Sequence, residues 1–221
     1  MTVSPGSAPR AYRAFLFDMD GTLITSTAAA ERVWTRWAER HGIDPVAFIP
    51  TIHGVRTADT IRRQNLPGVD LAAEVAWVER GEIEDVEGVA PIPGAIDFVK
   101  RLPPDRWAVV TSATAPLAQA RLKAAGVEPP AVLITAEDVE RGKPDPAGYR
   151  LAAQRLGVDV ADCLVFEDAP AGIAAGEAAG AEVLVVPAAW THPLETDHPQ
   201  LSDYGTATLV VEADGGLTLS V

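Results

Sequence analysis

The 221-residue sequence has little cysteine and no long apolar run. Cys163 is its single cysteine, so an intramolecular disulfide is excluded, and the apolar run around it predicts a buried, inert thiol. Residues 1–10 lack the apolar stretch of a signal peptide and are interpreted as a loose tail. No apolar segment approaches the roughly 20 residues needed to cross a bilayer. We therefore expect a cytoplasmic protein with no membrane partner.

Positive charge is also scarce, because 18 Lys and Arg residues stand against 31 Asp and Glu residues, for a net charge of −13. An acidic surface repels nucleic-acid phosphates and anionic lipid, so no nucleic-acid partner is expected. If such a protein handles an anionic phosphate, it needs local positive charge from a bound cation or a few placed basic residues. The plainer interpretation is that the net charge serves solubility alone.

Five short apolar runs predict buried strands: Ala14–Phe17, Trp107–Thr111, Val132–Thr135, Leu164–Phe166 and Val183–Val186. Runs that are apolar on both faces suit a parallel sheet that is covered on both sides. Helical patterns lie between them, with proline early and glycine late, as at Pro170 and Gly180. This alternation predicts an α/β fold, with a doubly wound, mainly parallel, Rossmann-like core.

The stretch after the first strand breaks this alternation. Residues 25–89 show no convincing strand, and helical patterns cover Ala28–His41, Thr57–Asn65 and Leu71–Ile83. We expect them to form a small all-helical cap domain, with residues 1–24 and 90–221 forming the catalytic core. Near the end of the chain, Thr208–Val211 and Leu217–Leu219 flank a glycine-rich turn and predict a hairpin.

Polar side chains follow several of the predicted strands, at the sheet edge where ligands bind in open α/β folds. They are Asp18 and Asp20 after the first run, Thr111 and Ser112 at the end of the second, Glu167 and Asp168 after the fourth, and Lys143 in a loop ahead of the fourth. Four carboxylates repel one another unless a cation joins them, and donors that are all oxygen favour Mg²⁺. Lys143 would lower the charge further and hold a phosphate oxygen.

Each of these pieces also has a plainer interpretation. Asp20-Gly21 is a common turn, Thr111-Ser112 is a possible helix cap, and the stretches at Lys143 and at Glu167 are a possible solvated loop and helix start. A calcium loop beginning at Asp18 is excluded, because its twelfth position is Ala29 and carries no acid. Chance alone would rarely bring all four pieces to one sheet edge, so their placement together favours a functional site.

In order along the chain, these motifs resemble the four motifs of the haloacid dehalogenase (HAD) superfamily: Asp18-x-Asp20-Gly21-Thr22, Thr111/Ser112, Lys143-Pro144 and Glu167-Asp168. The resemblance covers nearly the whole chain, and the helical insertion resembles the C1-type cap of that family. Three further segments resemble the branch that holds glycerol-phosphate and 2-deoxyglucose-6-phosphate phosphatases, namely residues 53–57, 134–139 and 166–173.

The resemblance implies a phosphatase that acts on a small sugar or polyol phosphate. It implies that Asp18 is the nucleophile and becomes an aspartyl phosphate, while Asp20 first protonates the leaving alcohol and then activates water. Ser112, with Thr111 as the alternative, would bind a phosphoryl oxygen. Lys143 would neutralise the nucleophile and the phosphoryl group.

The resemblance also implies Mg²⁺ and a substrate loop in the cap. Within that loop, His53 and Gly54 accompany Arg56, which we expect to bind distal hydroxyls or to orient the phosphate; the alternative is an exposed turn. Trp190 follows the last strand near the expected site mouth, for packing or for substrate contact. The implied Mg²⁺ ligands are the Asp18 carboxylate, the Asp20 backbone carbonyl, Asp168 and, directly or through water, Glu167.

Three alternatives stay open. A sugar-phosphate mutase of the same fold would carry a histidine where this chain has Ala30, and many capped relatives have an acid within the stretch that reads Ile24–Thr27 here. A dehalogenase attacks carbon and would give Asp20 and the Glu167-Asp168 pair no purpose. A phospho-acceptor signalling domain is the non-enzymatic alternative, but such a domain usually has no helical cap. We expect a monomer whose partner is a small phosphomonoester.

Overall fold

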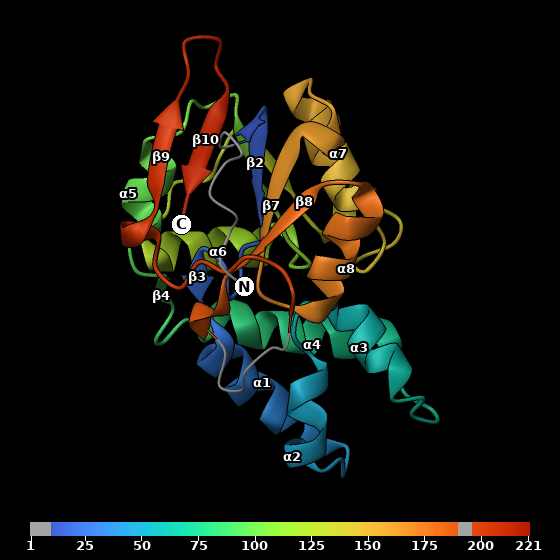
Figure 1. Cartoon of the computed structure of the whole chain (residues 1–221). Coiled ribbons are helices and arrows are strands. Elements are labelled where there is room, and N and C mark those ends of the chain that lie inside the picture. Colours follow the sequence, from blue (N-terminus) through green and yellow to red (C-terminus); the bar gives the residue numbers. More distant parts are fainter. Residues whose placement is uncertain (1–9, 190–195) are drawn as a thin grey trace.

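The computed structural model describes residues 10–189 and 196–221. Its centre is a five-stranded parallel sheet of order β6-β5-β2-β7-β8 (Figure 1). The strands are β2 (Ala14–Phe17), β5 (Trp107–Val110), β6 (Val132–Ile134), β7 (Cys163–Glu167) and β8 (Glu182–Val185). The predicted fold class and all five predicted strands are confirmed. Predictions about Trp190 and residues 1–9 fall outside the described residues.

Side-chain alternation along β2 divides the apolar interior into two layers. Phe15 and Phe17 pack with helices α5 (Ala95–Lys100) and α6 (Ala115–Ala125), whereas Ala14 and Leu16 pack with α7 (Ala147–Leu156) and α8 (Pro170–Ala179). All four β2 residues are fully buried. A strand covered by helices on both faces must be apolar throughout, which explains the continuous run in the sequence.

The register of the sheet brings the strand ends together. Phe17 lies beside Val109 of β5 and Phe166 of β7, so the residues that follow each of them emerge at one edge. Helix α8 begins at that edge with Pro170 in its first turn, where a missing N–H costs nothing, and ends before Gly180, which is left-handed with φ of 94°.

Helices α1 (Thr27–Arg40), α2 (Pro45–Phe48), α3 (Thr57–Arg63) and α4 (Leu71–Glu84) gather below the sheet in Figure 1. They enclose an apolar cluster of their own around Trp34, Trp37 and Phe48. Two short antiparallel strands, β3 (Ile24–Thr25) and β4 (Ala90–Pro91), pair where the chain leaves the sheet layer and returns to it. Neither strand is predicted from the sequence, because two residues are too few to show alternation.

The C-terminal hairpin is confirmed as β9 (Thr208–Val211) and β10 (Leu217–Ser220), and β10 also pairs with β1 (Ala11–Tyr12). Cys163 is buried as predicted, and this burial raises the pKa of its thiol to about 12. Within the described ranges, no helix combines the length and the apolar character that a membrane crossing requires.

Trp37 should be a main contributor to the stability of the helical segment. It is fully buried, and its Nε1 donates a hydrogen bond to Glu74 Oε2 at 2.9 Å. We predict that Trp37→Ala lowers the free energy of unfolding by about 3–5 kcal/mol, measured by urea titration. Trp77→Ala, at a half-buried position of α4, is the matched control and should cost clearly less. Equal, small losses would contradict this account of the cluster.

Candidate active site

The loop after β2 carries the first two acids of the site. Asp18 directly follows β2 and is 5% exposed, whereas Asp20 is partly exposed in the turn that comes next. The turn closes by a hydrogen bond from the Gly21 N–H to the Ile24 carbonyl at 2.7 Å. Gly21 has φ of 92°, and a Cβ there would lie 2.0 Å from Asp168 Oδ2. Glycine is thus required both by the backbone conformation and by the approach of Asp168.

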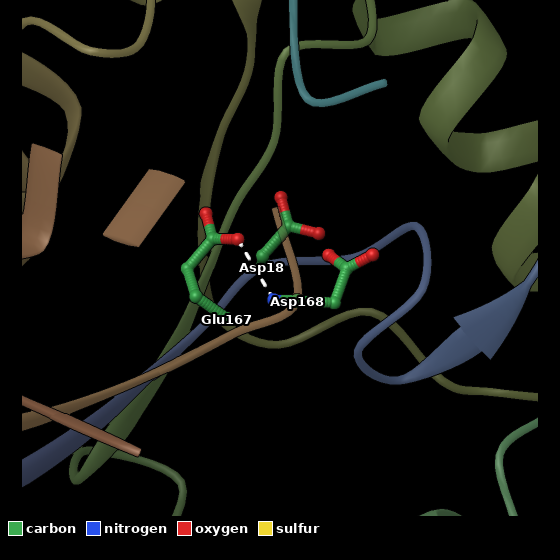
Figure 2. Close-up of side chains that lie close together, drawn as sticks. All are labelled: Asp18, Glu167 and Asp168. Atoms are coloured by element: carbon green, nitrogen blue, oxygen red, sulfur yellow. Dashed lines mark hydrogen bonds between the residues drawn. The ribbon is translucent and has the colours of Figure 1, made fainter. Parts of the chain in front are cut away.

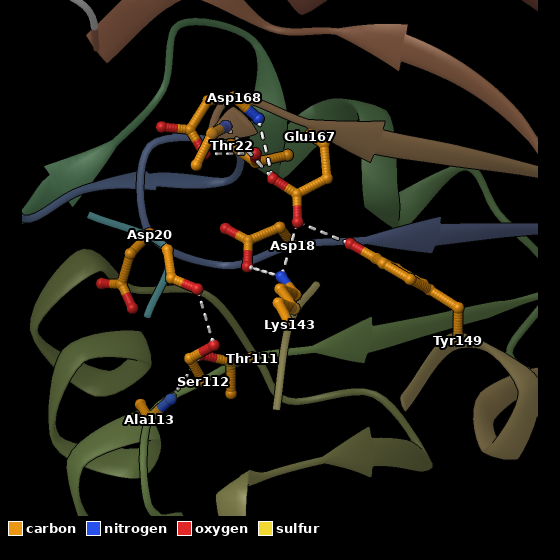
Figure 3. A network of polar contacts seen from close by, with 12 residues as sticks. Asp18, Asp20, Thr22, Thr111, Ser112, Ala113, Lys143, Tyr149, Glu167 and Asp168 are labelled. Carbon is orange, nitrogen blue, oxygen red and sulfur yellow. Dashed lines mark hydrogen bonds and ion pairs between the residues drawn. The ribbon is translucent and has the colours of Figure 1, made fainter. Parts of the chain in front are cut away.

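Lys143 joins two of the buried acids (Figure 3). Its Nζ donates to Asp18 Oδ1 and, at 2.6 Å, to Glu167 Oε1. Burial lowers the pKa of Lys143, but the charges of Asp18 and Glu167 outweigh this effect and hold the pKa above its usual value. The ammonium therefore stays charged and links the end of β2 to the end of β7.

Glu167 is saturated with hydrogen-bond donors. Oε1 accepts from Lys143 and from the Tyr149 hydroxyl at 2.7 Å, and Oε2 accepts from the backbone N–H groups of Asp168 and Ala169 at 3.0 and 3.3 Å. A carboxylate offers about four lone-pair sites, and all of them are used in this arrangement. Glu167 is thus suited to hold Lys143 and the chain turn in place.

The carboxylates of Asp18, Glu167 and Asp168 lie side by side at the sheet edge (Figure 2). One oxygen of each lies within 4.8 Å of the others, and all three residues are buried. Burial, only partly offset by Lys143, raises the pKa of Asp18 to about 8; burial and the charges of Asp18 and Glu167 raise that of Asp168 well above its usual value. One ammonium does not balance three carboxylates, so oxygen donors and excess negative charge together suit a hard divalent cation.

Asp20 is held by two donors that sequence analysis did not single out. Ser26 Oγ and Arg121 Nη1 both donate to Asp20 Oδ1, the latter at 3.0 Å. Arg121 lies in α6 and also donates to Glu82 of α4. Arg121 and Glu82 each left a signal in the sequence, namely a charged residue within an apolar stripe of a helix. Arg121 follows Leu117 by four residues, and Glu82 follows Val78 by four.

A pocket opens between the sheet edge and the helical segment. It brings most of the predicted site residues together, including residues from the inserted helices. Its lining includes Asp18, Asp20, Ser26, Ala30, Trp34, His53, Gly54, Glu82, Thr111, Ser112, Arg121 and Asp168. A ligand in it would contact the sheet edge and the helices at once.

Three predicted residues of the pocket already have partners. Ser112 Oγ donates to the Gly54 carbonyl at 3.0 Å, so the segment after β5 contacts the loop before α3. Thr111 Oγ1 accepts from the Ala113 N–H at 3.0 Å and so supports the turn. His53 Nε2 lies 3.5 Å from Glu31 Oε1, and burial lowers the pKa of His53 although Glu31 opposes this effect.

Arg56 is a predicted substrate-binding residue that does not line this pocket. Its guanidinium donates to the backbone carbonyls of Val139 and Glu140 at 2.8 and 3.1 Å. The side chain lies against Gly142, where a Cβ would meet Arg56 Nε at 2.5 Å. Arg56 thus fastens the loop before α3 to the segment that carries Lys143, and both of its terminal nitrogens are used there.

Comparison with known proteins identifies the family. Residues 12–180 match the model of the haloacid dehalogenase-like hydrolases. The chain belongs to this hydrolase family. Hexitol phosphatase A of Escherichia coli (strain K12) is 44% identical over 86% of this chain and 88% of its own length. The 2-deoxyglucose-6-phosphate phosphatase 1 of Saccharomyces cerevisiae is 38% identical over 75% of this chain and 76% of its own length.

The fold of this HAD-like hydrolase also matches solved structures. CbbY from Rhodobacter sphaeroides in complex with phosphate superposes with a TM-score of 0.73. The match covers 88% of this chain and 96% of the CbbY chain, at 22% sequence identity. At that identity, the likeness shows a shared fold.

A substitution at Gly172 tests the importance of Glu167 for the activity of this hydrolase. Gly172 lies in α8, and a Cβ there would fall 1.6 Å from Glu167 Oε1, so alanine must displace the carboxylate that holds Lys143. We predict that Gly172→Ala lowers hydrolytic activity by about 10- to 100-fold. Gly176→Ala is the control one turn later, where a Cβ would lie 2.9 Å from Val183 Cγ2. It should lower the melting temperature and spare activity; equal activity losses would contradict the role of Glu167.

Proposed function

We propose that the protein is a Mg²⁺-dependent phosphatase that hydrolyses a small sugar or polyol phosphate through an aspartyl phosphate on Asp18. The observation that carries this proposal is the buried junction of Asp18, Lys143, Glu167 and Asp168 beside Asp20, in a pocket shared by the sheet edge and the helical segment. Membership of the HAD-like hydrolase family and the similarity to sugar phosphatases support it.

In the first step, an oxygen of Asp18 attacks phosphorus. The bond from phosphorus to the ester oxygen breaks, and its electron pair goes to the alcohol oxygen, which takes a proton from Asp20. In the second step, water attacks the phosphorus of the aspartyl phosphate and gives a proton to Asp20, and Asp18 leaves as a carboxylate. The covalent intermediate divides one hard reaction into two easier ones. Lys143 holds Asp18 in position and offsets its charge, and Ser112 would bind a phosphoryl oxygen.

The chemistry of the donors supports Mg²⁺. Asp18 and Asp168 offer oxygens close together, with the backbone carbonyl of Asp20 as a further candidate ligand. Because Glu167 already accepts four hydrogen bonds, we propose that it holds Lys143 and the chain turn beside the other ligands and does not bind the metal directly. When bound, Mg²⁺ would neutralise the carboxylates and the phosphoryl oxygens.

We propose that residues 25–89 act as a cap domain over a core of residues 1–24 and 90–221. The helices have their own apolar cluster, and the short β3–β4 pair is the natural hinge. The pocket face of the cap carries His53 and Gly54, which would contact the sugar or polyol part, whereas Arg56 would anchor the loop. Ala30 lines the pocket and offers no group for proton transfer, which favours a phosphatase over a mutase.

The proposal also covers the oligomeric state, the cellular location and the partners of the enzyme. We propose a monomer that works in the cytoplasm without a nucleic-acid partner. The single cysteine, which cannot form an intramolecular disulfide, supports the cytoplasmic location, and the net charge of −13 argues against binding to polyanions.

The first prediction from this mechanism concerns Asp18. Asp18→Asn keeps the shape of the side chain but removes the attacking carboxylate, so phosphate release from a hexitol phosphate should fall by a factor of about 1,000 or more. Circular dichroism should show an unchanged fold. Asp214→Asn, in the exposed turn between β9 and β10, is the control and should keep full activity. Retention of about a tenth of the wild-type rate would exclude Asp18 as the nucleophile.

The second prediction concerns the metal. Excess chelator should stop phosphate release, because the acids then repel the phosphoryl group, and added Mg²⁺ should restore it. Ca²⁺ should support activity poorly, since it coordinates with looser geometry than Mg²⁺. Full activity in excess chelator would contradict a metal-dependent mechanism.

A further inference from the structure

Arg121 is a buried cation on a helix face that otherwise packs apolar side chains. It shares that face of α6 with Leu117, Ala118 and Leu122, and only 5% of its surface is exposed. A buried charge is costly unless it is paired and hydrogen-bonded. The reason for its position must therefore lie in the groups that it contacts.

Those groups are two carboxylates from different parts of the chain. Arg121 Nη1 donates to Asp20 Oδ1 in the loop after β2, and Nη2 donates to Glu82 Oε1 in α4, both at 3.0 Å. Glu82 is itself only 4% exposed. Among the described residues, the buried Nε of Arg121 finds no hydrogen-bond partner. The guanidinium is thus oriented to donate to both carboxylates, although its Nε donor is left without a partner.

The effect on Asp20 is to fix one of its two oxygens. Oδ1 accepts from Ser26 as well as from Arg121, whereas no described residue donates to Oδ2. Two donors on one oxygen set the plane of the carboxyl group, because both hydrogen bonds weaken when it rotates. The other oxygen is then left to carry and exchange a proton on the pocket side, where Asp20 lines the wall.

We propose that Arg121 is a positioning residue that aims Oδ2 of Asp20 at the leaving alcohol, and that Glu82 links this aim to the helical segment. The proposal rests on the phosphatase function proposed above and adds to it a residue outside the four motifs. As the ester bond breaks, Oδ2 gives its proton to the alcohol oxygen, which keeps the electron pair of that bond. Without Arg121, Asp20 is present but poorly oriented. The resulting loss of kcat/KM therefore depends on how strongly the leaving group needs a proton.

The test compares two esters in wild-type enzyme and in Arg121→Met. Glycerol phosphate has an alkoxide leaving group that requires a proton, whereas p-nitrophenyl phosphate releases a stable phenolate without one. The ratio kcat/KM reports the steps up to release of the first product, so it excludes hydrolysis of the intermediate. We expect kcat/KM to fall about 10- to 100-fold for glycerol phosphate and less than about 3-fold for the aryl ester, since general acid catalysis is worth about 100-fold or more.

Two further variants keep the test decisive. Arg121→Met leaves Glu82 buried without its cation and could fail to fold. The double variant R121M/E82M removes both charges, a change that proteins often tolerate, and it should show the same selective loss. Arg32→Met is the control, because Arg32 pairs with Asp85 at the end of α4 and lies outside the pocket. Arg32→Met should leave kcat/KM unchanged for both esters.

The outcomes separate this inference from the proposed function. If wild-type enzyme hydrolyses both esters and the variants lose the same factor on each, or change KM alone, Arg121 does not position the acid. If wild-type enzyme releases phosphate from neither ester and from no hexitol phosphate, the phosphatase proposal fails and the role of Arg121 fails with it.

Discussion

The structure depends on the contact of one buried ammonium with two buried carboxylates. Lys143 reaches Asp18 at the end of β2 and Glu167 at the end of β7, and Asp168 adds a third acid beside them. Removing these charges from water is unfavourable unless each is paired and hydrogen-bonded. Much of the local architecture meets that requirement: the Tyr149 hydroxyl and two backbone N–H groups complete Glu167, and Gly172 leaves room for it. The excess negative charge that remains is the physical reason for expecting a divalent cation.

Polar contacts join the helical segment to this centre at several separate points. Ser112 donates to the Gly54 carbonyl, Arg56 donates to carbonyls ahead of Lys143, and Arg121 pairs with Glu82. Each contact connects the inserted helices with a residue or segment that also serves the sheet edge. The helices can therefore influence the site through these hydrogen bonds to its residues, and not only through side chains that contact a ligand. In this respect the loop before α3 is as much an attachment point as a binding surface.

Much of this could be predicted from the sequence, for reasons that particular elements make clear. The apolar runs revealed the strands because both sheet faces are covered, and proline and glycine marked α8 at both ends. The acids were found because they follow strand ends, which a parallel sheet must bring together, and Lys143 was found in the loop before the helix that precedes β7. The two-residue strands β3 and β4 gave no periodic signal. The partners of Arg56 could not be predicted, because backbone carbonyls of a distant segment leave no trace in a sequence. Arg121 and Glu82 did leave one, since each interrupts an apolar stripe.

The central claim is that Asp18 carries the phosphoryl group between the two steps. The most direct measurement is to quench wild-type enzyme in acid during turnover of a sugar phosphate and to map its peptides by mass spectrometry. We expect one phosphoryl group per chain, on the peptide that contains Asp18, and none on enzyme quenched without substrate. A phosphoryl group on a different residue, or turnover with no phosphorylated peptide at any quench time, would contradict it.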